Sequence, residues 1–425
     1  MKKCAVFLFA YVVIFFSCQK SIGPDPEPEP GEDIVNGDFI YLETNDPTNN
    51  AILAYMQKGD SLIELPGSPF STGGTGIANP TQALGPNDAD NQLLITSDKN
   101  FLLAVNPGSN NISVFKIKDQ GQLEPVPGSP FNSYGQTPVS IAQNDNFIFV
   151  VNKALDSSDA QKPFPNYTVF TLDQAGSLKH ISNSSKSSAK GSSPTQVLIS
   201  KDKHYMFGTD FLGYTLNPAV GTLRSFGIDT GKLIGAEGTP YTIPEKGGAL
   251  GLWEHPSGNV LYVGFPQAGK VGVYTIDSST GVLSFNNSVD AGLAACWLRT
   301  DNAGNYLYAL NSGENSISVY NSANPTSLTP VQKLTLKNSG PTYTAMGSTF
   351  TTSEGYSLNL STSGKLLYVI SQYTNPDFSL GNYNLLHVLK VGTDGKLSEP
   401  TEPLPLPVPA NVRPQGVITV ANNNP

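Results

Sequence analysis

The sequence has few of the residues on which catalytic, metal-binding and disulfide-stabilised proteins often rely. Its 425 residues include three cysteines, four histidines and three arginines. His180, His204, His255 and His387 show no metal-ligand spacing, so we expect no metal site and no cofactor. No phosphate-binding glycine loop and no catalytic triad is visible. Helix formers are scarce, whereas 41 glycines and 33 prolines accompany many Asn, Ser and Thr residues, which favours strands joined by turns.

The N-terminal residues are expected to lie outside the fold. A basic start is followed by an apolar run at 5–16, too short to span a bilayer comfortably, and then by Cys18. The sequence IFFSC resembles a bacterial lipoprotein box, whose cysteine is lipidated; an ordinary cleaved signal is the alternative. We therefore predict a signal peptide at 1–17, a tether rich in proline and acid at 18–37, and a propeller domain at 38–425. The expected location is the bacterial cell envelope, at the outer membrane or cell surface, with the lipid anchor as the only membrane contact.

The net charge limits the possible partners, and the positions of the cysteines limit the possible disulfides. Removal of residues 1–17 takes away two lysines and shifts the net charge from −9 to −11. An acidic surface argues against nucleic acid and anionic lipid as partners. Cys4 leaves with the signal and Cys18 would carry lipid, so only Cys296 remains and no intramolecular disulfide can form. Cys296 lies in the apolar stretch AACWL and is expected to be buried.

A repeat organises the rest of the chain. The pentapeptide PGSPF occurs at 66–70 and at 127–131, and each copy ends a longer unit of apolar strand, short loop, alternating strand and turn. Seven such units begin near residues 39, 101, 147, 205, 261, 306 and 366, with a mean spacing of about 54 residues. Repeats of this length with several short strands are typical of a β-propeller. The motif PGSPF is predicted to end an outer strand and to begin the crossing to the next blade.

A fourth strand precedes every unit except the first, as in QLLITSD before residue 101. The strand that the first unit lacks appears at the other end of the chain, in PQGVITVAN from Pro414. We therefore predict an all-β fold, a seven-bladed β-propeller of four-stranded blades. A C-terminal strand completes the N-terminal blade, closes the ring and removes its open edges.

Strands of the type (Y/F)LYVxN, followed by xVxVFxID and GxL and joined by PGSPF, resemble the lactonase-type seven-bladed propeller family, which includes bacterial 6-phosphogluconolactonases. The resemblance covers nearly everything from Asp38 to Val420 and implies the propeller fold and sugar-lactone hydrolysis. Catalytic members carry an Asn-Arg-Gly segment after one inner strand and a Pro-Arg-His segment entering another. Here Asn152 is followed by Lys153-Ala154, and the entry to Trp253 reads GGALGLWEHP, so neither motif is intact. Whether the chain is an enzyme stays open.

Long connections predict a functional face. Loops from an outer strand to the next inner strand, and from a second to a third strand, share one face of a propeller. The long segments fall in this set, at 72–90, 154–166, 211–220, 337–355 and 373–382. The polar residues predicted to line this face near the channel are Asn106, Asn152, Lys153, Asp210, Asn311, Glu314 and Arg413. Turn formation is the alternative role for the asparagines, and a salt bridge between blades is the alternative for Arg413.

Three functions are compatible with these features. The leading hypothesis is a binding propeller whose partner is a small molecule, a carbohydrate or another envelope protein. The first alternative is a sugar-lactone hydrolase at the channel mouth, in which Lys153 or Arg413 stabilises the developing oxyanion and Asp210 directs water. The second alternative is a structural envelope scaffold.

Lipid anchoring can be tested at Cys18. Cys18→Ala removes the residue that would carry lipid, so we expect the variant to lose fatty-acid labelling and to move from the membrane to the soluble fraction. Metabolic labelling and cell fractionation measure both effects. A variant that keeps its label and its membrane location would show that the lipoprotein interpretation is wrong.

Overall fold

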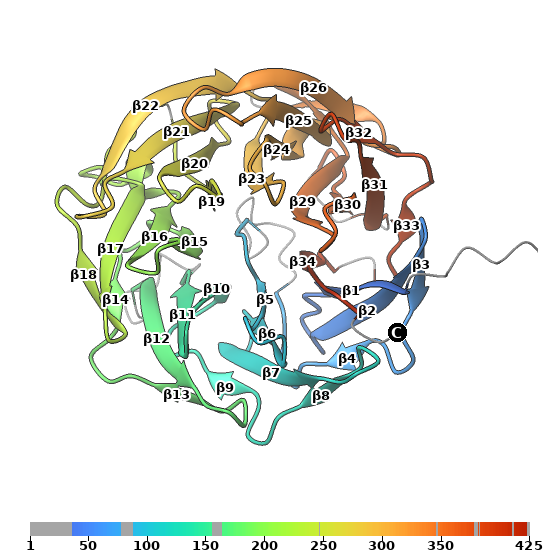
Figure 1. Ribbon diagram of the computed structural model, residues 1–425, viewed down its shortest axis with the longest axis horizontal. Helices are drawn as coiled ribbons and strands as arrows, with labels where there is room; N and C mark the ends of the chain where they lie inside the picture. Colours follow the sequence, from blue (N-terminus) through green and yellow to red (C-terminus); the bar gives the residue numbers. More distant parts are fainter. Residues whose placement is uncertain are drawn as a thin grey trace, which may run out of the picture. The chain divides into compact units, whose positions relative to one another are not determined.

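The computed structural model describes residues 36–77, 88–154, 164–245, 247–345, 347–377, 381, 383–409 and 412–422. These residues form seven antiparallel blades around a central axis (Figure 1). The prediction of an all-β, seven-bladed propeller is confirmed. The predicted signal peptide, Cys18 and most of the predicted tether lie outside the described residues. No helix in the described ranges is long and apolar enough to cross a membrane.

In each blade the strands are ordered outward from the innermost strand, and where a fifth strand is present it pairs with the third strand. Blade 1 comprises β34 (Gln415–Val420), β1 (Asn36–Glu43), β2 (Ala51–Lys58), β3 (Ser61–Glu64) and β4 (Phe70–Ser71). Blade 2 comprises β5 (Leu93–Ile95), β6 (Phe101–Asn106), β7 (Asn111–Ile117), β8 (Leu123–Pro125) and β9 (Phe131–Asn132). Blade 3 comprises β10 (Pro138–Asn144), β11 (Phe147–Asn152), β12 (Asn166–Leu172), β13 (Leu178–His180) and β14 (Lys186–Ser187). Blade 4 comprises β15 (Pro194–Ile199), β16 (Tyr205–Asp210), β17 (Leu223–Asp229) and β18 (Lys232–Gly235).

The last three blades follow the same order. Blade 5 comprises β19 (Leu252–Glu254), β20 (Val260–Phe265), β21 (Lys270–Ile276) and β22 (Leu283–Asp290). Blade 6 comprises β23 (Ala295–Thr300), β24 (Tyr306–Asn311), β25 (Ser316–Asn321) and β26 (Thr329–Thr335). Blade 7 comprises β29 (Ser353–Leu360), β30 (Leu366–Tyr373), β31 (Leu385–Val391), β32 (Leu397–Ser398) and β33 (Leu404–Pro405). A separate hairpin, β27 (Thr342–Ala345) and β28 (Ser348–Thr351), precedes blade 7, and two 3-10 turns lie at η1 (Gly213–Thr215) and η2 (Ser312–Glu314).

Apolar side chains between neighbouring blades hold the ring together. On β1, Phe39 and Tyr41 pack against blade 2, whereas Ile40 and Leu42 pack against blade 7. Alternate side chains of one strand therefore serve two interfaces. Because each blade is covered on both faces, second strands such as β6 are buried throughout and read as continuous apolar runs.

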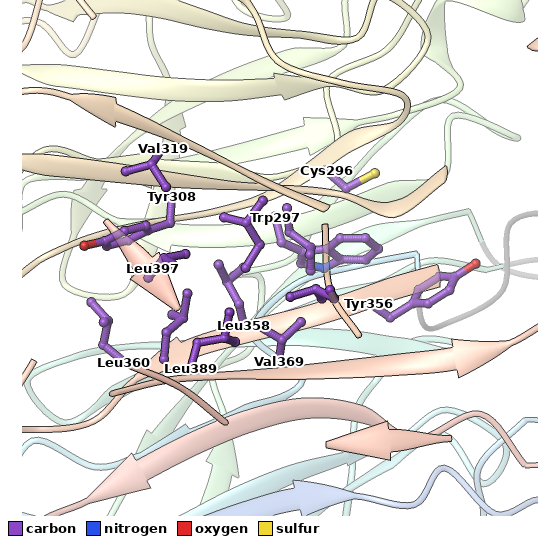
Figure 2. Close-up of a cluster of buried hydrophobic side chains, with 14 of the residues drawn as sticks. Cys296, Trp297, Tyr308, Val319, Tyr356, Leu358, Leu360, Val369, Leu389 and Leu397 are labelled. Atoms are coloured by element: carbon purple, nitrogen blue, oxygen red, sulfur yellow. The ribbon is translucent and has the colours of Figure 1, made fainter. Parts of the chain in front are cut away.

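The interface between blades 6 and 7 shows how large side chains fill these layers (Figure 2). Trp297 and Tyr308 of blade 6 meet Tyr356, Leu358 and Leu389 of blade 7, and all five are buried. The rings of Trp297 and Tyr356 make an edge-to-face contact with centroids 5.3 Å apart. Such a contact adds to the free energy gained from burial alone.

The motif PGSPF interrupts the outer strand, so the prediction that it ends this strand is wrong. In blade 1, Phe70 is the last residue of the motif and begins β4. It pairs with Ile52 on β2, the third strand of the blade. Within the interruption, the Ser68 hydroxyl accepts a hydrogen bond from the Ala54 N–H at 3.1 Å. The second copy repeats both features in blade 2. The serine therefore supplies the acceptor that the interrupted ladder lacks.

The C-terminal strand closes the ring, as predicted. Four consecutive pairs, from Phe39↔Val420 to Leu42↔Val417, join β1 to β34 in antiparallel register. Beyond them the Gln415 amide donates to the Glu43 carboxyl group at 3.3 Å. Glu43 is fully buried, and this burial raises the pKa of its carboxyl group to about 8.

Deleting the chain after Ala410 removes β34 and leaves the edge of β1 without its partner. Each lost backbone hydrogen bond costs about 1 kcal/mol and each buried valine about 1.5–3 kcal/mol, so we expect the free energy of unfolding to fall by several kcal/mol. Urea unfolding followed by tryptophan fluorescence measures the change. Deletion of residues 423–425 is the matched control, because it leaves β34 intact. An unchanged midpoint and slope after the longer deletion would contradict the closure.

Candidate binding site at the channel mouth

The long connections lie where the strand order predicts, on one face of the propeller. Their described residues are 72–77, 88–92, 154, 164, 165, 211–222, 336–345, 347–352, 374–377, 381, 383 and 384, and we call the face that these residues form the long-loop face. One predicted range needs correction. Residues 337–355 are not a plain loop, because they contain the hairpin β27–β28 and the start of β29.

A short segment at residues 88–91 ties three blades together across the axis. The Trp297 indole N–H of blade 6 donates to the Ala89 carbonyl at 2.8 Å, and the Asp90 N–H donates to the Thr195 carbonyl of blade 4 at 3.2 Å. Figure 1 shows this segment running through the middle of the ring toward β5. The polypeptide itself therefore bridges the channel.

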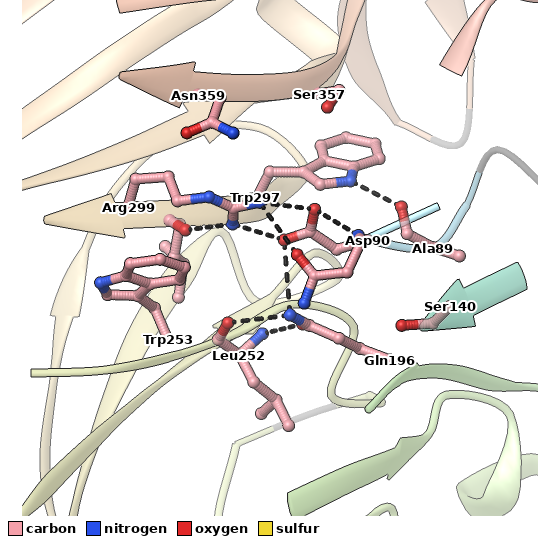
Figure 3. A network of polar contacts seen from close by, with 12 residues as sticks. Ala89, Asp90, Ser140, Gln196, Leu252, Trp253, Trp297, Arg299, Ser357 and Asn359 are labelled. Carbon is pink, nitrogen blue, oxygen red and sulfur yellow. Dashed lines mark hydrogen bonds and ion pairs between the residues drawn. The ribbon is translucent and has the colours of Figure 1, made fainter. Parts of the chain in front are cut away.

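The centre of this bridge is an ion pair between Asp90 and Arg299 (Figure 3). The two guanidinium nitrogens donate to the two carboxylate oxygens at 2.6 and 3.0 Å, and the side chains are only 1% and 7% exposed. The guanidinium carbon also lies 4.6 Å from the centre of the Trp253 ring, a cation–π contact. Sequence reasoning missed this pair. A charged residue inside the apolar strand ACWLRT, in a chain with three arginines, was the available signal.

Four charged side chains gather where the innermost strands begin, at the mouth on the long-loop face. Lys153 is buried and donates from Nζ to the Asp88 carbonyl at 2.9 Å. Loss of solvation lowers the pKa of Lys153 to about 8, an effect that the Asp88 charge opposes. Asp88 also interacts electrostatically with Glu354, and Glu354 interacts with Arg413. The predicted residues Lys153 and Arg413 are thus linked through two acids that were not predicted.

Glu354 and Arg413 form the second half of this mouth. The hydroxyl groups of Tyr356 and Tyr343 donate to the two Glu354 oxygens at 2.9 and 3.2 Å. Burial nevertheless raises the pKa of Glu354, against the effects of Tyr356, Arg413 and Tyr343. Arg413 is 6% exposed; in the described part of the chain its Nε has no hydrogen-bond partner and its guanidinium group joins no ion pair. The alternative of a salt bridge at Arg413 therefore finds no support among the described residues.

The other predicted site residues are engaged by neighbouring side chains. Asn106, Asn152 and Asn311 are buried at the ends of second strands and donate to side chains of the adjacent third strand. Asp210 pairs with Arg224, and burial raises the pKa of Asp210. Glu314 pairs with Lys333. Among the described residues, no group of three or more His, Cys, Asp or Glu side chains could hold a metal ion.

Fold and geometry together define a closed β-propeller with a polar site at one mouth of its channel. Residues 252–369, from β19 into β30, match the family described as Lactonase, 7-bladed beta-propeller. This match covers part of the chain, and the described chain as a whole forms the seven-bladed propeller that the sequence resemblance predicted.

Solved structures with the same fold cover almost the whole chain. A protein of Bacteroides uniformis, provisionally assigned as a 6-phosphogluconolactonase, superposes with a TM-score of 0.64 at 17% identity, over 91% of this chain and 100% of its own. The periplasmic gluconolactonase of Pseudomonas aeruginosa gives 0.64 at 17%, over 90% of this chain and 99% of its own. No curated protein sequence matches the chain. At these identities the likeness concerns the fold.

Breaking the Asp90–Arg299 pair should destabilise the ring. Asp90→Asn leaves a buried guanidinium without a carboxylate, so we expect the free energy of unfolding to fall by about 3–5 kcal/mol. The double variant Asp90→Leu with Arg299→Met removes both charges and should recover much of this loss. Lys118→Ala, which breaks an exposed pair with Glu124, is the control and should cost less than about 1 kcal/mol. Urea unfolding measures all three, and equal losses for Asp90→Asn and Lys118→Ala would refute the expected role of the buried pair.

Proposed function

We propose that this protein is a lipid-anchored lipoprotein of the bacterial cell envelope that binds a polyhydroxylated small molecule, a sugar or a sugar lactone, at the channel mouth on its long-loop face. The observation that carries the proposal is the state of Arg413. Its buried guanidinium lies close enough to Glu354 to influence that carboxyl group, yet Glu354 is hydrogen-bonded by two tyrosines instead. A buried charge without a hydrogen-bonded partner is costly, and oxygen atoms of a ligand would compensate it.

The distribution of exposed aromatic side chains supports binding at the same face. Four large aromatic residues that are 38–65% exposed lie in loops of the long-loop side, namely Tyr134, Phe164, Tyr214 and Tyr383. The other exposed large hydrophobic residues lie on outer strands. Aromatic rings offer a large, rigid contact area at a low cost in conformational entropy, which suits the flat face of a sugar ring.

The comparisons support the chemical class of the ligand. One structural neighbour is a gluconolactonase, and two are provisionally assigned as 6-phosphogluconolactonases. We extend from these proteins to this chain only the class of compound, a sugar lactone or the sugar acid that it yields. This class also fits a mouth that offers both cations and acids.

Lactone hydrolysis is the second candidate, and the opposite pKa shifts at the mouth favour it. The pKa of Lys153 is lowered and that of Glu354 is raised, an arrangement typical of sites that move protons. Two features rank hydrolysis below binding. Lys153 cannot reproduce the planar fork of an arginine, and Gly248-Ala249-Leu250 stand where a Pro-Arg-His segment would be needed. Asp210, the predicted water-directing acid, is engaged by Arg224.

Binding is tested by titration calorimetry of the full-length protein with D-gluconate and D-glucose. We expect gluconate to bind and Arg413→Gln to weaken this binding at least tenfold, because the variant removes the buried cation that would meet the oxygen atoms of the ligand. Lys390→Gln makes the same charge change on an exposed pair with Asp60 and should leave the affinity unchanged. If neither compound binds, or if Arg413→Gln has no effect, the proposal fails.

The same protein separates binding from catalysis when glucono-1,5-lactone is the substrate in a pH-stat. Each missing oxyanion donor costs about 3 kcal/mol, so we expect hydrolysis no more than about tenfold above the buffer rate. Turnover well above that rate, abolished by Lys153→Ala with Arg413→Ala in a protein that still folds, would make hydrolysis the better assignment.

A further inference from the structure

A second cavity lies on the opposite face, where tight turns follow the innermost strands. Its volume is about 230 Å3, and residues at the ends of β10, β15 and β19 line it, among them Leu198, Ile199, Lys201, Trp253 and Glu254. It shares no residue with the mouth on the long-loop face. The cavity is therefore independent of the function proposed for that mouth.

Glu254 occupies a position that is apolar or Thr in equivalent blades. Five blades make the same turn after the innermost strand, in which the first turn residue donates its N–H to the carbonyl of the first residue of the next strand, as Ser200 does to Tyr205 and His255 to Val260. The residues immediately before these five turns are Ile95, Ile199, Glu254, Thr300 and Leu360. An ionisable side chain at a position that packing fills with Ile or Leu needs a separate reason.

Packing does not provide this reason. One Glu254 oxygen, Oε2, accepts a hydrogen bond from the Lys201 N–H at 2.7 Å. The other, Oε1, has no partner among the described residues, although Glu254 is only 2% exposed. At the end of β10, the amide oxygen of Gln143 makes the equivalent hydrogen bond, which it accepts from the Ser97 N–H at 2.8 Å. A neutral side chain is thus sufficient for the structural bond, and Oε1 of Glu254 is surplus to it.

The surroundings narrow the chemistry of a ligand. Trp253 forms one wall; its indole N–H is engaged by Thr300 at 2.9 Å, so the ring offers the cavity an apolar surface. Lys201 and Lys203 also line the cavity; Lys203 pairs with Asp145, and the charge of Lys201 disfavours a cation. We infer that this cavity is a second binding site, and that it takes a hydroxylated ring of monosaccharide size whose hydroxyl group donates to Oε1 of Glu254.

The test uses Glu254→Leu, because Leu360 occupies the equivalent position in blade 7. The probe is methyl β-D-glucopyranoside. It is added to full-length protein with Arg413→Gln, so that sugar binding at the mouth on the long-loop face is weakened. Saturation-transfer NMR and titration calorimetry should detect binding, and Glu254→Leu should reduce it at least tenfold. The melting temperature should stay equal or rise, since the variant removes a buried carboxyl oxygen that has no partner among the described residues, and Lys201 is an exposed residue whose N–H can bind water.

Glu254→Gln is the second variant, and it keeps an acceptor for Lys201 while placing a donor at the cavity. It should therefore fold as the parent protein does and also lose the sugar. Undiminished sugar binding in both variants overturns the inference. So does a lowered melting temperature in Glu254→Leu with sugar binding retained, because that result assigns Glu254 a purely structural role. Binding of tetramethylammonium in place of the sugar, dependent on Glu254, would equally overturn it.

Discussion

Hydrogen bonding between β34 and β1 is the constraint on which the rest of this structure depends. It converts a row of seven sheets into a ring, and it creates the apolar interface between blades 7 and 1. The same connection delivers Arg413 to the channel mouth, two residues before β34 begins. A residue near the end of the chain thereby joins a site whose other members, such as Lys153 and Glu354, come from blades 3 and 7. The candidate site therefore depends on the same strand pairing that closes the ring.

The closed ring buries charged side chains, and these charges must satisfy one another. Arg224 pairs with Asp210 and Arg299 pairs with Asp90, so two of the three arginines are neutralised within the protein. Arg413 is also buried but joins no ion pair in the described part of the chain. This contrast within one molecule is the reason for proposing Arg413, rather than Arg224 or Arg299, as the cation that meets a ligand.

The fold could be predicted because each blade repeats a local signal. QLLITSD predicted the strand found at β5, and PQGVITVAN predicted the closing strand β34. The ion pair between Asp90 and Arg299 could not be predicted, since its partners are 209 residues apart and meet only across the axis. Glu354 was hidden for a different reason. It was counted within a long loop, whereas its backbone belongs to β29 and its carboxyl group is held by tyrosines on either side of it in sequence.

A propeller carries its own internal comparison, because seven units solve the same packing problem. Where the units agree, as in the apolar residues before the turns at Ile95, Ile199 and Leu360, packing explains the choice. Where one unit departs at an equivalent position, packing has lost free energy that another interaction must offset. Arg299 meets this condition through Asp90, within the protein. Glu254 meets it only in part, with one oxygen bonded and one without a partner among the described residues, and this difference is the observation behind the second binding site that we infer.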